Sequence, residues 1–172
     1  KMVDNFMPSL KKEGAEIFVS DINLNSLKHA SETFGAKIVE GNEIYGLNVD
    51  VFAPCALGAI LNTENIDVLN CDIIAGAANN QLAIEDEHGN QIKEKGLLYA
   101  PDFLINAGGL INVYSEYIGY NRENAMRDTE NIFDTTLSIY DLAEQKGMHT
   151  QRAATILAQK RIDDILGVQS TL

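Results

Sequence analysis

The sequence predicts an α/β fold with a mostly parallel sheet, and three patterns support this prediction. Short apolar runs of strand length alternate with longer segments in which apolar residues recur at helical spacing. Several of the apolar runs pass directly into small or amide residues. Two long helical segments close the sequence, so long C-terminal helices are expected beside the sheet.

The first part of the chain is expected to alternate helix, strand and helix. Apolar residues recur at helical spacing across residues 2–12. Residues 17–19 follow as a short buried strand. A second helix covers residues 23–34, because an asparagine stands at its start as an N-cap and Gly35 stands at its end.

Three later apolar runs share a common pattern, a strand followed by small or amide residues. The strands are expected at residues 49–53, 72–75 and 97–99, with a further strand candidate at 103–105. Small or amide residues follow at 54–56, 76–80 and 106–109. In open α/β sheets, ligands bind outside the carboxyl ends of the strands, so these segments are the expected floor of a ligand crevice.

The remaining segments are expected to be a loop and two helices. Residues 85–95 are polar and predict a surface hairpin or loop without chemistry. An apolar stripe predicts one long helix over residues 121–145. Thr150 is expected to cap a final helix that runs to residue 166 and ends at Gly167.

Composition excludes several classes of function. The net charge is −12, with 13 basic and 25 acidic residues, and this disfavours a nucleic-acid partner. No apolar run approaches the roughly 20 residues that span a bilayer, so no membrane partner is expected. Cys55 and Cys71 are expected to be reduced, partly buried thiols of a cytoplasmic protein. The three histidines lack metal-ligand spacing, and no metal site is expected.

Asp21 lies just past the C-terminal end of the first predicted strand. An acid at this point of a dinucleotide-binding fold can accept hydrogen bonds from the adenosine ribose and repel a 2′-phosphate. Asp21 can equally be an acid that the dipole of the following helix favours. The glycine-rich phosphate loop would end about 20 residues earlier, near Lys1 to Val3, so the first strand and the leading glycines are expected upstream. This predicts a Rossmann-like doubly wound domain over residues 1–120, with residues 121–172 as helices that pack on it.

Two asparagines and two apolar residues near the predicted strand ends have alternative interpretations. Asn79 and Asn106 carry amide donors and acceptors that suit a carboxamide such as nicotinamide, although asparagine also favours turns and caps. Leu110 and Val113 are spaced for one helix face, and either line a substrate pocket or belong to the core. Cys55 has no nearby histidine to activate it, so it is not expected to be a nucleophile.

Several ordered motifs resemble one known enzyme family. They are APCALG at residues 53–58, IAGAANNQL at 74–82, YAPDFLINAGG at 99–109 and YIGYNR at 117–122. Together they resemble the glutamate/leucine/phenylalanine/valine dehydrogenases, and the similarity is closest to the leucine dehydrogenases of that family. It extends over nearly the whole chain.

The resemblance implies an NAD-dependent amino-acid dehydrogenase. Its reaction would be the reversible oxidative deamination of branched-chain L-amino acids (leucine, valine, isoleucine) to 2-oxo acids and ammonia. The resemblance also implies an N-terminal catalytic domain that carries the acid–base lysines, and assembly into homo-oligomers. No residue of this chain is therefore assigned as an acid–base catalyst, and the segment alone is expected to be inactive.

The resemblance also implies roles for individual positions. The positions that match cofactor contacts are the end of the phosphate loop, the acid that binds the adenosine ribose and the residue after it, the segment beside the adenine ribose, and the two asparagines near the nicotinamide. These are Lys1, Met2, Val3, Asp4, Asp21, Ile22, Cys55, Ala56, Leu57, Asn79 and Asn106. Leu110 and Val113 match the substrate-pocket positions, and their apolar character argues against glutamate as substrate.

Two positions depart from the family pattern, and two other functions stay open. Val3 stands where the glycine fingerprint usually has Gly or Ala, and Leu110 stands where Val is common. The added methylene at Leu110 is worth about 1–3 kcal/mol in discrimination, so the preference among apolar amino acids is open.

The chain could instead be a non-catalytic NAD-sensing module, or an interaction domain that has lost nucleotide binding.

Overall fold

The computed structural model describes residues 2–169, and for residues 2–5 and 168–169 it describes the backbone only. The chain divides into two compact units, Lys1–Asn48 and Val49–Leu172. Each unit has its own parallel sheet. The predicted α/β fold with parallel strands is therefore confirmed, and the two units are described separately below.

The first unit is a small parallel strand pair with helices. Its elements are α1 (Met2–Lys12), β1 (Phe18–Val19), α2 (Leu24–Phe34), β2 (Lys37–Ile38) and the 3₁₀ helix η1 (Gly41–Gly46). In the strand pair, Phe18 lies opposite Lys37. Both predicted helices form: the Asn23 side chain caps α2, and Gly35 ends it with a φ of 71°.

The second unit carries a sheet in the order β3 (Val51–Phe52), β4 (Ile73–Ile74) and β5 (Leu98–Tyr99), all parallel. All three strands lie at predicted positions. Its helices are α3 (Thr63–Val68), α4 (Glu85–Glu94), α5 (Asp102–Ile105), α6 (Gly108–Ile118), α7 (Arg122–Lys146) and α8 (Thr150–Gln169). The most deeply buried side chains of this unit include Leu61, Ile66, Ile74 and Ile92. They come from β4, α3, α4 and the segment after β3, so burial of apolar surface joins these elements.

Two local predictions in this unit were wrong. Residues 85–95 form helix α4 instead of a hairpin or loop, because three acids favour its first turn and a narrow face that includes Ile92 is buried. Residues 103–105 form helix α5 instead of a strand. Pro101 precedes α5, and the Asp102 carboxylate accepts a hydrogen bond from the Phe103 N–H at 2.8 Å, which favours a helix start.

The two long C-terminal helices form as predicted, but the last helix starts and ends differently from the prediction. Asn121 caps α7 through the Asn124 N–H, and Gly147 ends it with a φ of 64°. The prediction that Gly167 ends the last helix was wrong, because Gly167 does not adopt a left-handed conformation and α8 continues to Gln169. Thr150 lies inside α8, and its hydroxyl donates to the Tyr99 carbonyl oxygen at 2.7 Å instead of capping. That hydrogen bond joins the start of α8 to the end of β5.

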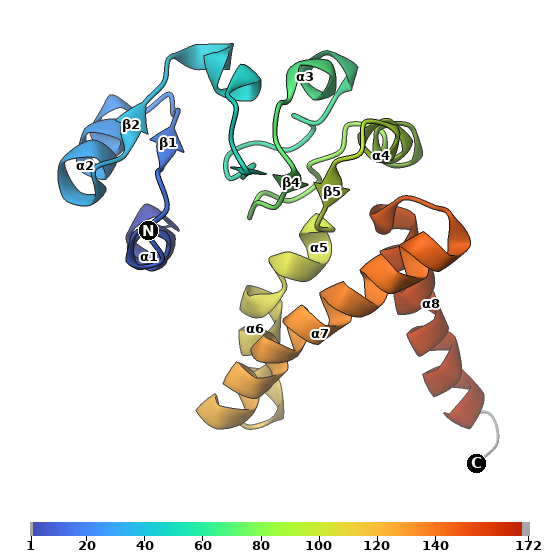
Figure 1. The fold of residues 1–172 in the computed structure, drawn as a ribbon. Coiled ribbons are helices and arrows are strands. Elements are labelled where there is room, and N and C mark those ends of the chain that lie inside the picture. The colour runs from blue at the N-terminus through green and yellow to red at the C-terminus, as the bar shows by residue number, and fades with distance from the viewer. Residues whose placement is uncertain (1, 170–172) are drawn as a thin grey trace. The chain divides into compact units, whose positions relative to one another are not determined.

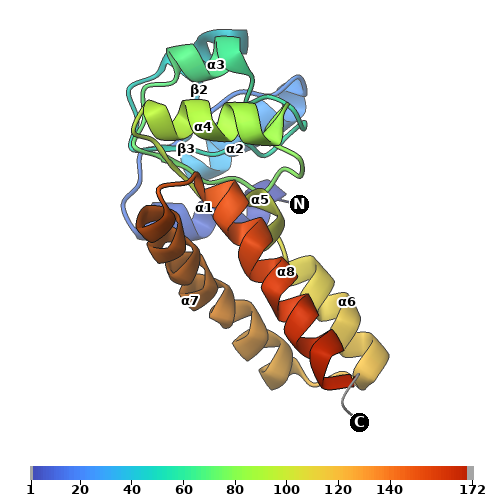
Figure 2. The same cartoon turned by 90° about the vertical axis from the view of Figure 1, so that its right-hand side faces the viewer.

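Helices α5 to α8 lead away from the sheet and return to it. Figure 1 shows α6 continuing the direction of α5, α7 running back towards the sheet, and α8 leaving the sheet again. Figure 2 shows the same second unit from the side, with α4 above the start of α8. No helix within residues 2–169 combines the length and the hydropathy that a membrane span requires.

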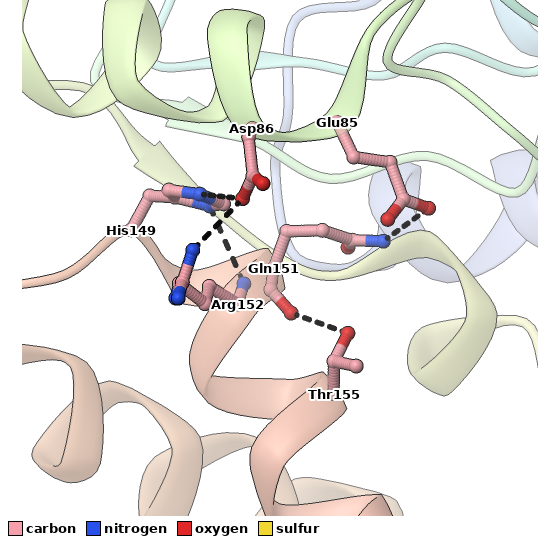
Figure 3. A network of polar contacts seen from close by, with 6 residues as sticks. All are labelled: Glu85, Asp86, His149, Gln151, Arg152 and Thr155. Atoms are coloured by element: carbon pink, nitrogen blue, oxygen red, sulfur yellow. Dashed lines mark hydrogen bonds and ion pairs between the residues drawn. The ribbon is translucent and has the colours of Figure 1, made fainter.

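A polar network joins the start of α8 to the start of α4 (Figure 3). The Asp86 carboxylate lies 3.2 Å from Nε2 of buried His149 and 3.5 Å from the Arg152 guanidinium. The Gln151 amide donates to the Glu85 carboxylate at 3.3 Å. Because these groups connect two helices that are far apart in sequence, they fix where the α7–α8 pair meets the sheet layer.

Candidate functional site

The segments after β3, β4 and β5 lie side by side at the carboxyl edge of the sheet. The register places Val51 opposite Ile73 and Ile73 opposite Leu98, so the three strands end at the same level. Pro54 follows β3, Gly76 follows β4, and α5 begins shortly after β5. This edge is therefore the place where an open parallel sheet binds ligands.

The first two of these segments touch through their backbones. A β-carbon added at Gly76 would lie 2.1 Å from the Pro54 carbonyl oxygen, and the same oxygen accepts the Ala78 N–H at 2.9 Å. A β-carbon added at Gly58 would lie 2.9 Å from the Asn79 carbonyl oxygen. Glycine is required at both contacts because any side chain would force the segments apart. The edge consequently has a low floor that is formed by the main chain.

Asn79 and Asn106 meet at this edge, although Asn79 follows strand β4 and Asn106 follows helix α5 instead of the strand predicted there. The Asn106 side-chain amide donates a hydrogen bond to Oδ1 of Asn79. Asn79 is exposed and Asn106 is half-buried. This contact leaves Nδ2 of Asn79 and Oδ1 of Asn106 unused, and within the described residues neither atom makes a hydrogen bond. The pair therefore presents a donor and an acceptor to the solvent side of the edge, and a ligand carboxamide needs both.

Two buried polar residues lie beneath the pair, and sequence reasoning did not single them out. The Gln81 side chain is completely buried, and its amide donates to the carbonyl oxygens of Gly76 and Ala78 at 2.7 and 2.9 Å. The buried Asp102 carboxylate accepts the backbone N–H of Gln81 at 3.0 Å. No sequence pattern indicated either role, because a glutamine or an aspartate beside a strand end is usually solvated.

The neighbourhood of Asp102 also affects Tyr99 of β5. Burial raises the pKa of the Tyr99 hydroxyl well above its usual value, and the charge of the Asp102 carboxylate raises it further. Tyr99 is therefore a neutral phenol at physiological pH. It belongs to the buried layer under the edge and not to its acid–base chemistry.

The predicted adenine-ribose segment, Cys55 to Leu57, is exposed after Pro54. The expectation that Cys55 is partly buried was wrong, because the chain leaves the sheet at this point. Cys71 is buried, and that burial raises the pKa of its thiol. Both cysteines are free thiols.

Leu110 and Val113 lie on an open face of α6. Their exposed fractions are 73% and 61%, so the interpretation as core residues was wrong. Asn106 ends α5 and Leu110 lies in the first turn of α6, so both belong to the same stretch of chain beyond β5. The role of Leu110 and Val113 in a substrate pocket stays a prediction.

Asp21 belongs to the first unit and follows β1. Its carboxylate accepts the backbone N–H of Asn23 at 2.8 Å, directly before α2 begins. This contact orients the carboxylate and supports the turn before the helix. Asn23 and not Asp21 is the N-cap of α2, and the first turn of α2 holds no acid, so the helix-dipole role weighed for Asp21 stays a prediction. Within the described residues its second oxygen makes no hydrogen bond, and both Asp21 and Ile22 are exposed. The roles of Asp21 and Ile22 at an adenosine stay predictions.

The predicted phosphate-loop positions lie at the start of the chain. Lys1 lies outside the described residues. Met2, Val3 and Asp4 form the first turn of α1, and their side chains are likewise outside the described part. A glycine-rich loop before a helix binds phosphate at the helix N-terminus, so the backbone of this turn is compatible with the predicted role.

A family model matches residues 8–169, and its description is Glutamate/Leucine/Phenylalanine/Valine dehydrogenase. An L-tryptophan dehydrogenase of Nostoc punctiforme is 49% identical over 160 residues, which are 93% of this chain and 45% of that protein. A leucine dehydrogenase of Bacillus cereus is 49% identical over 162 residues, 94% of this chain and 44% of that protein. The chain thus spans less than half the length of these curated relatives.

Solved structures support the same fold. The crystal structure of L-tryptophan dehydrogenase from Nostoc punctiforme matches with a TM-score of 0.90 and 48% identity, over 94% of this chain and 49% of that chain. A hetero-hexameric glutamate dehydrogenase from Thermus thermophilus matches with a TM-score of 0.66 and 20% identity, over 92% of this chain and 42% of that one. The second similarity supports the fold alone.

Proposed function

The chain belongs to the glutamate/leucine/phenylalanine/valine dehydrogenase family, and we propose that it is the NAD-binding segment of an amino-acid dehydrogenase. The proposed reaction is the reversible oxidative deamination of branched-chain L-amino acids to 2-oxo acids and ammonia. The observation that carries this proposal is the hydrogen-bonded pair of Asn79 and Asn106 above a main-chain floor at the carboxyl edge of the sheet.

The residues at the edge fit a dinucleotide. The low floor at Gly76 and Gly58 lets a flat ligand lie across the strand ends, and the exposed segment 55–57 borders it. Asn79 and Asn106 would hold the nicotinamide carboxamide and ribose. When bound, the dinucleotide supplies the acceptor for the hydride that leaves the amino acid.

We propose NAD instead of NADP as the cofactor because of Asp21. Its carboxylate is fixed by the Asn23 N–H and is exposed at the end of β1. A carboxylate can accept hydrogen bonds from a ribose 2′-hydroxyl, whereas a 2′-phosphate beside it would be repelled. Asp21 therefore offers a physical reason for discrimination between the two dinucleotides.

We propose that α6 selects the amino-acid side chain. Leu110 and Val113 expose two aliphatic side chains on the helix that follows Asn106, and an apolar substrate side chain would be buried against them. A glutamate side chain would bring an unpaired carboxylate to this face, which is unfavourable. The relatives described above are named for tryptophan and leucine, and both substrates are apolar.

The proposed organisation places a dinucleotide-binding domain at residues 1–120. Residues 121–172 would pack on it and towards a catalytic domain elsewhere in the protein, which would supply the acid–base groups. Exposed apolar side chains along α7 and α8, such as Phe133, Leu137, Ile162 and Ile165, support such a contact. We further propose a cytoplasmic homo-oligomer for the full-length protein.

The test uses the full-length protein. Titration with NAD and NADP, followed by binding fluorescence, should give tighter binding of NAD. Leucine, valine, isoleucine, phenylalanine and tryptophan should then be compared as substrates by the appearance of reduced cofactor. Failure to bind either dinucleotide would overturn the proposal, whereas binding of NAD without turnover of any amino acid would favour an NAD-sensing module.

A further inference from the structure

The Gln81 side chain holds the segment after β4 in one conformation. Its amide nitrogen donates to both the Gly76 and the Ala78 carbonyl oxygens, and the side chain is completely buried. The two carbonyl oxygens belong to the residues on either side of Ala77, and Ala78 directly precedes Asn79. Because one amide group satisfies both, rotation of this segment would leave two buried acceptors without a hydrogen bond. Gln81 therefore fixes the backbone that leads into Asn79.

The Asp102 carboxylate holds the same segment from the other side. One oxygen accepts the Gln81 N–H at 3.0 Å, and the other accepts the Phe103 N–H at 2.8 Å. The first hydrogen bond reaches the segment after β4, and the second fixes the first turn of α5. Both oxygens act as acceptors for main-chain N–H groups, so an amide in place of the carboxylate could satisfy only one of them. Asp102 is therefore a rigid link between the two segments.

These two links hold the segments that carry the two asparagines. Asn79 lies between Ala78 and Gln81 in sequence, and the Asn106 N–H donates to the Asp102 carbonyl oxygen at 3.1 Å. The contact between the two asparagine side chains faces solvent, where water competes for each amide. A fixed mutual position of Asn79 and Asn106 must therefore come from the buried hydrogen bonds beneath them, and not from their own contact.

We propose that Gln81 and Asp102 are positioning residues, which set the donor and acceptor of the Asn79–Asn106 pair at the spacing that a ligand carboxamide requires. The nature of that ligand, the nicotinamide ring of a dinucleotide, rests on the proposed function. Neither positioning residue touches the ligand. They affect binding by holding the asparagine pair in place. A residue that only stabilises the fold would not have this effect on the pair.

The experiment uses the full-length protein and a matched pair of substitutions. Q81M keeps the length of the side chain and removes both donated hydrogen bonds, while D102N disturbs the link from the other side. Q151M is the control, because Gln151 is also a buried glutamine of this unit, and its amide hydrogen bond is to Glu85 at the start of α4. Each substitution is also made in an N79A/N106A background. The readouts are the NAD dissociation constant, the melting temperature and a crystal structure.

Positioning predicts a specific pattern in these readouts. Q81M and D102N should each weaken NAD binding by about tenfold, as removal of residues that support a binding group commonly does. In the N79A/N106A background the same substitutions should have less than about a twofold effect on NAD, although the melting temperature falls equally in both backgrounds. Crystals of Q81M should show the Asn79–Asn106 hydrogen bond broken. Q151M should lower the melting temperature and leave NAD binding unchanged.

Two results would overturn the inference. The first is a Q81M or D102N protein that keeps the asparagine contact in the crystal and binds NAD as the parent does. The second is an equal loss of NAD binding in both backgrounds, which would mean that the buried pair acts independently of the asparagines. A parent protein that does not bind NAD would defeat the proposed function instead, and the crystal structures would still decide the positioning role.

Discussion

Gly76 offers the sharpest test of the backbone contact that forms the floor of the edge. In Gly76→Ala the new β-carbon would lie 2.1 Å from the carbonyl oxygen of Pro54, 2.3 Å from its nitrogen and 2.6 Å from its carbonyl carbon. All three are main-chain atoms, so no side-chain rotation can relieve the overlap. The segments after β3 and β4 must separate by roughly an ångström to reach an ordinary contact, which also strains the hydrogen bond from Ala78 to Pro54.

The expected cost follows from that geometry. Overpacking typically destabilises by about 1–3 kcal/mol, and a contact with fixed backbone belongs at the upper end, about 3 kcal/mol. For a domain of this size, that corresponds to a fall in melting temperature of about 6–12 °C, measured by thermal unfolding of the full-length protein. Gly109→Ala is the matched control, because a β-carbon there meets no atom within 4 Å. Equal melting temperatures for the two variants would refute the reasoning.

Three further predictions address other parts of the molecule. Burial raises the pKa of Tyr99, so the unfolded chain loses that proton first. The stability that Tyr99 contributes is therefore fully present below about pH 10 and falls as the pH rises above that value. Tyr99→Phe should flatten this alkaline loss in urea titrations, and Tyr117→Phe, which removes a hydroxyl at an 89% exposed position, is the surface control. Iodoacetamide at pH 8 should label exposed Cys55 and spare buried Cys71, because burial raises the pKa of the Cys71 thiol. Bound NAD should slow the labelling of Cys55. Mass spectrometry of the intact folded protein measures the labelling of each cysteine with and without NAD. Asp21→Asn keeps an acceptor for the Asn23 N–H and removes the charge, so NAD should bind about tenfold more weakly and NADP more tightly; an unchanged ratio of the two dissociation constants would contradict the role of Asp21.

Much of the fold could be predicted because its signals are local. The asparagine and glycine at the ends of α2 act through hydrogen bonds and backbone angles within a few residues, and α2 forms where those residues indicate. The strands β3, β4 and β5 also lie within the predicted apolar runs. Asn79 and Asn106 could be placed only in part, because Asn79 follows β4 as expected, whereas Asn106 follows helix α5 and not the predicted strand at 103–105.

The parts that could not be predicted depend on contacts between distant residues. Helix α4 has mostly polar residues, and only its packing in the folded unit shows that His88 and Ile92 are buried. Gln81 and Asp102 are buried by neighbours that the sequence does not reveal, so their roles depend on the assembled edge. The exposure of Leu110 and Val113 likewise follows from how α6 leaves the sheet, because helical spacing alone does not say which face is covered.

The arrangement separates the parts proposed to place a ligand from the part expected to choose a substrate. The floor consists of main chain at Pro54 and Gly76, and the groups proposed to fix the asparagine pair are buried, so we expect substitutions among them to shift both asparagines together. The α6 face is exposed and makes no such contact, so its side chains can change size without moving the edge. Amino-acid dehydrogenases named for leucine and for tryptophan are each 49% identical to this chain. We therefore expect exchanges at Leu110 and Val113 to alter the ranking of amino acids while the NAD dissociation constant stays constant, and a parallel change in both quantities would show that the two functions are not separated.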